Sequence, residues 1–301
     1  MLIKNNYKAI LFFLKGLKWQ IVLIISYAII ASLFDHSPVG VLINIPITIS
    51  TVIATMISLL LAFRIAQSYD RWWEARKVWG EIVNDSRTLI RQIMLFIPNP
   101  NSEERKSEIK IFAERQIIWC YTLSESLRVQ KTSSKVQQYL TAHNLQADNI
   151  PLLLIQKHSE NLHFITEKYT LNSNQQVQID TTIARLTDAM GKCERIKNTV
   201  FPKNYSYLIH CLIYLFVTLL PFGLSEIDII TEILLTSLIP LMFIAFEKTA
   251  IIMQDPFENI PTDIPMTTIC NTIENNINQI IGEVNYQKEN MRFEKYYKNY
   301  V

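Results

Sequence analysis

One long stretch without charged residues constrains this chain more than any other feature. From Val41 to Phe63 the sequence contains no Asp, Glu, Lys or Arg. A helix of roughly 23 residues rises about 35 Å, which is enough to cross the hydrocarbon core of a bilayer. Charged residues begin at Arg64, yet neither Pro nor Gly occurs between Pro46 and Gly80. The sequence therefore predicts one helix that starts in the membrane and continues into the cytoplasm.

Three further apolar stretches predict an all-α membrane protein with four transmembrane helices and a cytosolic helical bundle. Trp19–Phe34 precedes the stretch described above, whereas Tyr205–Ser225 and Ile229–Phe246 follow it. The last of these contains Glu232 near one end and Pro240 in its middle. A membrane helix tolerates such a proline where neighbouring helices satisfy the freed backbone groups.

The basic residues that flank the predicted spans gather on one side of the membrane. By the positive-inside rule, both termini are then cytoplasmic and residues 35–40 lie outside. No small-residue cleavage site follows the first apolar segment, so we expect no removable signal peptide. The flanking basic residues are Lys4, Lys8, Lys15, Lys18, Arg64, Arg71, Arg76, Lys77, Lys192, Arg195, Lys197 and Lys203.

The remaining sequence predicts polar helices outside the membrane. The second helix is expected to end near Phe96, before two prolines, and Asn101 is expected to cap the next one. Periodic apolar residues predict further helices at 133–142 and 151–169, one after Asn172, and a last one from Ile269 to Ile280. The expected parts are an N-terminal region with two spans (1–80), a cytosolic helical region (81–204), two further spans (205–250) and a cytosolic C-terminal segment (251–301).

Composition and motifs argue against several classes of function. The 29 basic and 27 acidic residues nearly balance, so nucleic acid is not an expected partner. The four cysteines are scattered without CxxC spacing, which favours reduced thiols over a disulfide or zinc framework. Nucleophile elbow, P-loop, dinucleotide-binding glycine and HExxH motifs do not occur, so we expect no enzyme, no cofactor and no metal. His158 and His163 are expected on an exposed helix face, and His210 as a neutral, hydrogen-bonded imidazole near the membrane interface.

Thr55, Leu59 and Phe63 recur every four residues and share one face of the second predicted helix. Val52 and Met56 flank this stripe. Ordinary packing against a neighbouring helix explains such a stripe in most membrane helices. The alternative is a pore-lining face, which forms a hydrophobic constriction when it is repeated around a symmetry axis.

A family signature favours the pore-lining alternative. The run from Phe63 to Gly80 combines Arg71, Trp72, Glu74, Arg76 and Trp79 at fixed spacing. This run resembles the signature of the bestrophin family of membrane channels, particularly its bacterial branch. Shorter matches follow in the family's order along nearly the whole chain, at Gly191–Ile196, Leu219–Phe222, Asp255–Pro256–Phe257, Asp263–Pro265 and Cys270–Glu274.

The resemblance implies a homopentamer around one central pore in the cell (inner) membrane. It places Thr55, Leu59 and Phe63 in a three-ringed hydrophobic neck and Phe201 at a narrow cytosolic aperture. The implied partners are further copies of this chain, the lipid bilayer and small inorganic ions, with chloride or another small anion as the permeant species.

One departure from the family concerns calcium. Eukaryotic bestrophins bind calcium through an acidic run that follows the Asp-Pro-Phe motif. In this chain Ile260 and Pro261 interrupt that run. Calcium needs six to eight oxygen ligands, and Asp255, Glu258 and Asp263 alone supply too few. We therefore expect no activation by calcium.

Three alternatives to an anion channel stay open at the level of sequence. The first is a cation (sodium)-selective channel, as in some bacterial relatives, because an uncharged neck sets no preference of sign. The second is a carrier, although such proteins usually show ionisable residues at mid-membrane and paired broken helices. The third is a membrane-anchored scaffold whose cytosolic helices carry the function.

Overall fold

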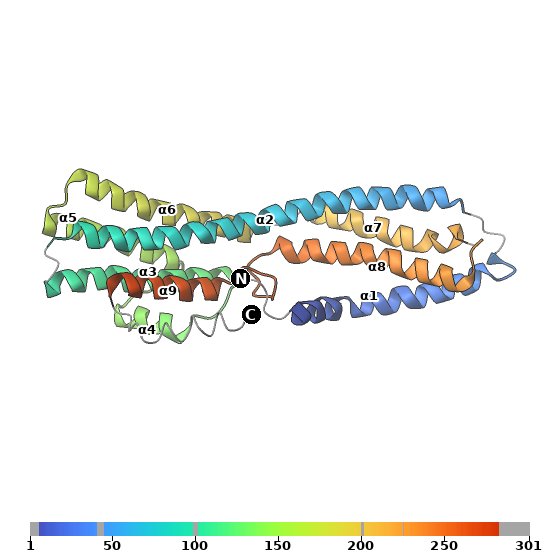
Figure 1. The fold of residues 1–301 in the computed structure, drawn as a ribbon, viewed down its shortest axis with the longest axis horizontal. Helices are drawn as coiled ribbons and strands as arrows, with labels where there is room; N and C mark the ends of the chain where they lie inside the picture. Colours follow the sequence, from blue (N-terminus) through green and yellow to red (C-terminus); the bar gives the residue numbers. More distant parts are fainter. Residues whose placement is uncertain (1–5, 41–44, 99–101, 200–201, 225, 283–301) are drawn as a thin grey trace, which may run out of the picture. The chain divides into compact units, whose positions relative to one another are not determined.

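The computed structural model describes residues 6–40, 45–98, 102–199, 202–224 and 226–282, which are all-helical and contain no strand (Figure 1). The chain divides into two compact units. The first unit comprises residues 1–74 and 197–264, and the second comprises residues 75–196 and 265–301. The predicted all-helical class is confirmed.

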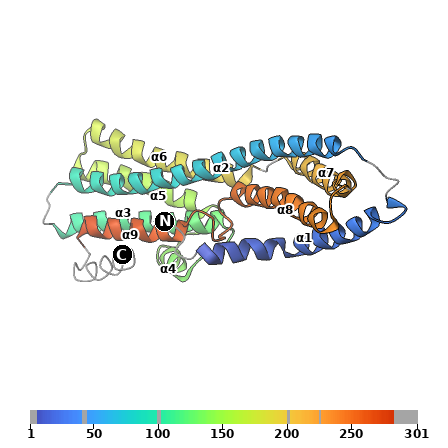
Figure 2. The same cartoon turned by 45° about the vertical axis from the view of Figure 1, so that its right-hand side comes forward.

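Apolar helices form the first unit. It contains α1 (Asn6–Asp35), the beginning of α2 (Ile47–Phe96), α7 (Lys203–Leu219), the 3-10 turn η2 (Pro221–Gly223) and α8 (Ile229–Gln254). Helix α1 lies alongside α8, as both views show (Figures 1 and 2). A hydrophobic core joins α2 to α7, and side chains of α1 and α8 pack against it; its buried members are Ile53, Ile57, Leu61, Ile209, Ile213, Phe216, Val217 and Leu220.

Three helices of this unit are apolar and long enough to cross a membrane. Among the described residues, these helices are bounded by Phe13–Asp35, Ile47–Phe96 and Ile229–Gln254, and each contains an apolar window of 18 residues. The predicted third span is shorter than expected, because α7 is helical and apolar only over Asn204–Leu219. Pro221 explains the early end: it lacks a backbone N–H and begins the separate turn η2. The continuous helix predicted across the charge boundary is observed as α2, which contains 50 residues.

The second unit contains the polar helices. They are the later part of α2, α3 (Glu103–Leu127), α4 (Ser134–Ala142), α5 (Ile150–Tyr169), α6 (Ser173–Asn198) and α9 (Met266–Ile281). Trp79, Phe112 and Trp119 have no exposed surface and form the bulkiest part of its core. Helix α9 packs on α3, where Tyr121 donates a hydrogen bond of 2.8 Å to Glu274.

The helix starts in this unit follow local capping rules, with one correction. Asn149 caps α5 by accepting a hydrogen bond of 3.0 Å from the backbone N–H of Leu152. Ser102 caps α3 in the same way, through the backbone N–H of Arg105 at 3.2 Å. The predicted cap Asn101 was therefore one residue too early, and Asn101 itself lies outside the described residues.

The prediction of an exposed His158 is wrong. The imidazole is fully buried on α5 and stacks on Phe112 of α3, with ring centroids 5.4 Å apart. Burial and the nearby charge of Arg115 hold the pKa of His158 well below its ordinary value. The ring is therefore a neutral core side chain. His163 is exposed, as expected, and lies 3.5 Å from Glu167.

Candidate functional site

Helix α2 presents two different faces within the first unit. Ile53, Ile57 and Leu61 form a buried stripe that packs on α7. Their spacing of four residues keeps them on one side of the helix. This contact fixes the rotation of α2 about its own axis, and it therefore fixes which side chains point away from α7.

The predicted neck residues lie on the opposite face. The side chains of Leu59 and Phe63 are 68% and 58% exposed in the single chain. Thr55 is also exposed, and its hydroxyl donates to the backbone carbonyl of Thr51 at 2.9 Å. The hydroxyl is thus satisfied within its own helix. What this face offers to its surroundings is an uncharged, mostly apolar stripe.

A tyrosine of α7 holds the end of this stripe in place. The Tyr205 hydroxyl donates a hydrogen bond of 2.8 Å to the backbone carbonyl of Leu60. Its ring also lies beside that of Phe63, with centroids 6.4 Å apart. Phe63 is therefore positioned by a neighbouring helix although most of its ring is exposed. The predicted aperture residue Phe201 lies outside the described residues.

Directly after Phe63, a buried ion pair joins α2 to α8, and a partly exposed histidine of α7 contacts it. Nη1 of Arg64 lies 2.9 Å from Oε1 of Glu247, and both side chains are at most 3% exposed. Oε2 of Glu247 lies 3.1 Å from Nε2 of His210, a residue expected to be neutral and hydrogen-bonded. Sequence reasoning did not single out Glu247. Its position in an apolar helix was the available signal, because an ionisable group inside a membrane helix usually has a partner or a function.

Two of the family-signature residues on α2, Arg71 and Trp72, contact residues that follow α8. Nη2 of Arg71 lies 3.9 Å from Oδ1 of Asp255, and the Trp72 indole N–H donates to the carbonyl of Thr262 at 3.3 Å. Pro256 and Phe257, which also follow α8, are buried. These contacts tie α2 to the segment that follows α8.

The other signature residues lie at or beyond the boundary between the units. Glu74 is half-buried, and it is the last residue of the first of the two ranges that make up the first unit. Arg76 is half-buried, and Trp79 is fully buried in the core of the second unit. The signature is therefore a set of packing and orienting residues rather than one cluster.

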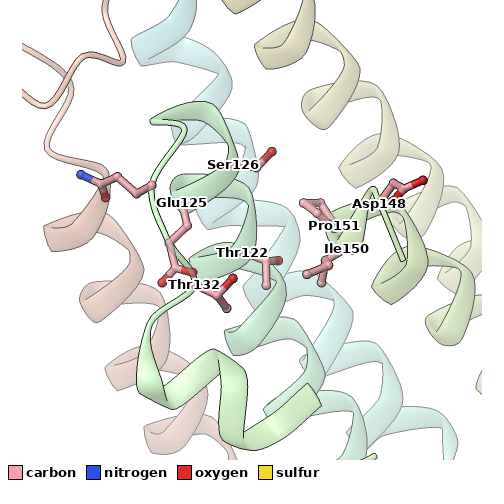
Figure 3. A pocket seen from close by; sticks show the side chains of 8 residues that line it. Thr122, Glu125, Ser126, Thr132, Asp148, Ile150 and Pro151 are labelled. Atoms are coloured by element: carbon pink, nitrogen blue, oxygen red, sulfur yellow. The ribbon is translucent and has the colours of Figure 1, made fainter. Parts of the chain in front are cut away.

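The second unit contains a pocket at the end of α3 (Figure 3). Glu125 points into the region between α3 and the loop that follows it, and its carboxylate accepts a hydrogen bond from the backbone N–H of Ser133 at 3.2 Å. This charge therefore stabilises the turn that leads into α4. The pocket is lined by Thr122, Glu125, Ser126, Gln130, Thr132, Asp148, Ile150 and Pro151.

Comparison with known proteins identifies the family of this chain and several similar proteins. The family model for bacterial and fungal bestrophin proteins matches residues 9–279. The chain is 30% identical over 241 residues to a voltage-dependent anion channel-forming protein of Nostoc sp., with 78% of each protein covered. It is also 30% identical over 240 residues to a protein of the same name from Escherichia coli K12, which covers 77% of this chain and 76% of that protein.

A solved structure shows the same fold. The crystal structure of a bacterial bestrophin homologue from Klebsiella pneumoniae superposes on 88% of this chain and 98% of its own, with a TM-score of 0.80 and 24% identity. Family, apolar helices and fold agree that this is a membrane protein. The chain belongs to the bacterial and fungal bestrophin family.

Proposed function

We propose that this protein is a passive anion channel whose pore is lined by the exposed face of α2. One observation carries the proposal: the uncharged stripe of Thr55, Leu59 and Phe63 is exposed on the face of α2 opposite its buried stripe. The relatives named as anion channel-forming proteins support anions as the permeant ions. The channel is not an enzyme in this proposal, and it needs no cofactor to conduct.

In this proposal the chain is a multi-pass protein of the inner membrane with both termini in the cytoplasm. Residues 81–204 and 251–301 are cytosolic, and α7 completes the set of spans. Phe201 forms a second, narrower ring at the cytosolic exit. The lipid bilayer and other copies of the chain cover the apolar surface that the single chain exposes.

The first prediction concerns assembly. One helix cannot enclose a pore, so several copies of Thr55, Leu59 and Phe63 must face a common axis. We expect the protein in mild detergent to form a closed ring of five chains. Native mass spectrometry or light scattering measures this directly. A monomer under conditions that preserve activity would contradict the pore.

Ion selectivity tests the proposed function itself. In a planar bilayer with asymmetric NaCl, the reversal potential of the single-channel current should lie toward the equilibrium potential of chloride. An uncharged neck does not set this preference, so charges near the pore mouths must do so. A reversal toward the sodium potential would instead establish a cation channel. The absence of any single-channel current would favour a carrier or a scaffold.

The segment after α8 supports a channel that calcium does not activate. Each of its carboxylates already has a partner: Asp255 lies near Arg71, Glu258 lies 2.6 Å from Nζ of Lys197, and Asp263 accepts from the backbone N–H of Ile260 at 3.2 Å. Burial also raises the pKa of Asp263 to about 6, which weakens it as an anionic ligand.

We therefore expect the current to be the same with and without micromolar calcium at the cytoplasmic side. Inside-out recordings with buffered calcium, and with magnesium as the control ion, measure this. Reversible activation by calcium alone would show that the three carboxylates rearrange into a binding site.

A further inference from the structure

The first unit contains a second group of charges, where α1 ends and α8 begins. Asp35 is the last residue of α1, His36 follows it, and Glu232 lies in the first turn of α8. One ligand atom from each of these side chains lies within 4.8 Å of the other two. We name these three residues the α1–α8 cluster. The proposed channel function does not use it.

The two carboxylates of the cluster are buried and have few polar neighbours. Asp35 is 1% exposed and Glu232 has no exposed surface. Among the described residues, neither oxygen of Asp35 accepts a hydrogen bond, and the neighbours of the Glu232 carboxylate are His36 and the hydroxyl of Ser32. An anionic group out of water is costly unless a charge or hydrogen bonds compensate it. Two ionised carboxylates at this place would therefore lack the usual compensation.

Local backbone charges add to this imbalance. Glu232 benefits from the partial positive charge at the start of α8, but Asp35 lies at the end of α1, where the partial charge is negative. Nδ1 of His36 lies 3.3 Å from Oε2 of Glu232 and 3.1 Å from the backbone carbonyl of Ser32. A protonated His36 could neutralise one carboxylate only. The other would still be uncompensated.

The loop after α1 turns back tightly on the end of that helix. Ser37 donates a hydrogen bond of 2.6 Å to the carbonyl of Phe34 and accepts one of 3.2 Å from the backbone N–H of Gly40. A Cβ atom added to Gly40 would clash with the carbonyl oxygen of Phe34 and the Cα of Asp35. Only glycine permits this close approach. The chain thus folds back tightly against the backbone of Phe34 and Asp35 at the end of α1.

From this geometry we propose that the α1–α8 cluster binds one divalent transition-metal ion such as zinc. A divalent cation supplies two positive charges and so neutralises both carboxylates. An imidazole nitrogen beside two carboxylates is a ligand set that suits zinc or manganese, whereas calcium and magnesium prefer oxygen ligands alone.

The spacing and the access route fit this proposal. Two ligands at about 2.0–2.2 Å from a common zinc ion are at most roughly 4 Å apart. Side-chain adjustments of about an ångström therefore close the cluster around an ion. The buried hydroxyls of Ser32 and Thr236 lie one helical turn from Asp35 and Glu232 and are available to support the ligands. The side chain of His36 is 36% exposed and offers the way in from solvent.

A metal here joins two helices that are far apart in the sequence. Asp35 and His36 come from the end of α1, and Glu232 comes from the start of α8. The sequence predicted no metal, because it contains neither a metal-binding motif nor a set of histidines with ligand spacing. Only the packing of α1 on α8 brings the three side chains together.

The test is metal binding by the full-length protein in detergent, which does not depend on conduction. Protein stripped with chelator is dialysed against ZnCl2, and bound zinc is quantified per chain together with the thermal unfolding midpoint. We expect one zinc ion per chain to be bound at this site and the midpoint to rise with zinc concentration. Asp35→Asn and Glu232→Gln keep the shape of each side chain and should each weaken binding at least about tenfold.

Matched controls make the result specific. Glu167→Gln alters the exposed His163–Glu167 pair and should leave zinc affinity unchanged. His36→Ala replaces an exposed residue and should weaken binding even if a carboxylate variant folds poorly. The proposal is overturned if wild-type protein shows no zinc-dependent stabilisation, or if all three cluster variants bind zinc like wild type. It is also overturned if Asp35→Asn stabilises the metal-free protein while zinc does not bind, because the carboxyl groups then share a proton instead.

Discussion

Replacing both Leu59 and Phe63 with alanine should raise the single-channel current without changing the sign of the permeant ion. The two side chains lie one helical turn apart, so in a ring of chains they form two apolar layers along about 6 Å of the pore. An ion in such a constriction loses water and gains no ligands. Each 1.4 kcal/mol removed from this barrier would raise the rate of permeation about tenfold.

The matched control is a pair of exposed leucines on another helix. Leu234 and Leu238 are also four residues apart and are 55% and 51% exposed on α8. Replacing both with alanine removes similar apolar volume away from the proposed neck. We expect wild-type conductance and open probability for this control. Wild-type behaviour of the Leu59→Ala, Phe63→Ala variant would mean that the stripe is a packing surface.

Breaking the buried ion pair behind the neck should have the largest effect on stability. Glu247→Gln leaves the guanidinium of Arg64 buried without its anionic partner at 2.9 Å. Removing one member of a buried ion pair typically costs about 3–5 kcal/mol. We expect a marked drop in the thermal unfolding midpoint in detergent, and a smaller drop when Arg64→Met and Glu247→Leu are combined, because no lone charge is then buried.

An exposed ion pair provides the comparison for this result. Nζ of Lys192 lies 3.0 Å from Oε2 of Glu81, and both side chains are more than 40% exposed. Glu81→Gln should cost less than about 1 kcal/mol, as is usual for surface pairs. Equal losses for Glu81→Gln and Glu247→Gln would show that the buried pair contributes no special stability.

The features that could be predicted from the sequence are those set by local chemistry. A run without Pro or Gly predicted the continuity of α2, and Pro98 predicted its end near Phe96. The exposure of Leu59 and Phe63 agrees with the stripe defined by their spacing, although their role in a pore stays a prediction. The length of α7 was overestimated because apolar composition continued across Pro221, which starts a separate turn.

Buried polar residues were the main failure. His158 lies four residues from both Leu154 and Leu162, which are buried on the same face of α5, so its burial could have been inferred from spacing. Spacing along the sequence could not have revealed the pairing of Arg64 with Glu247 or the α1–α8 cluster. These contacts join residues that are distant in the chain, and only the packing of the helices determines which ends meet.

Because α2 is a continuous helix, the position of a residue along it is related to its depth in the membrane. Residues 47–74 of α2 belong to the first unit, and as a helix they rise about 42 Å, more than the roughly 30 Å of a bilayer's hydrocarbon core. Successive residues along it differ in depth by about 1.5 Å. A reporter attached to this part of α2 would therefore measure its own distance from the membrane surface.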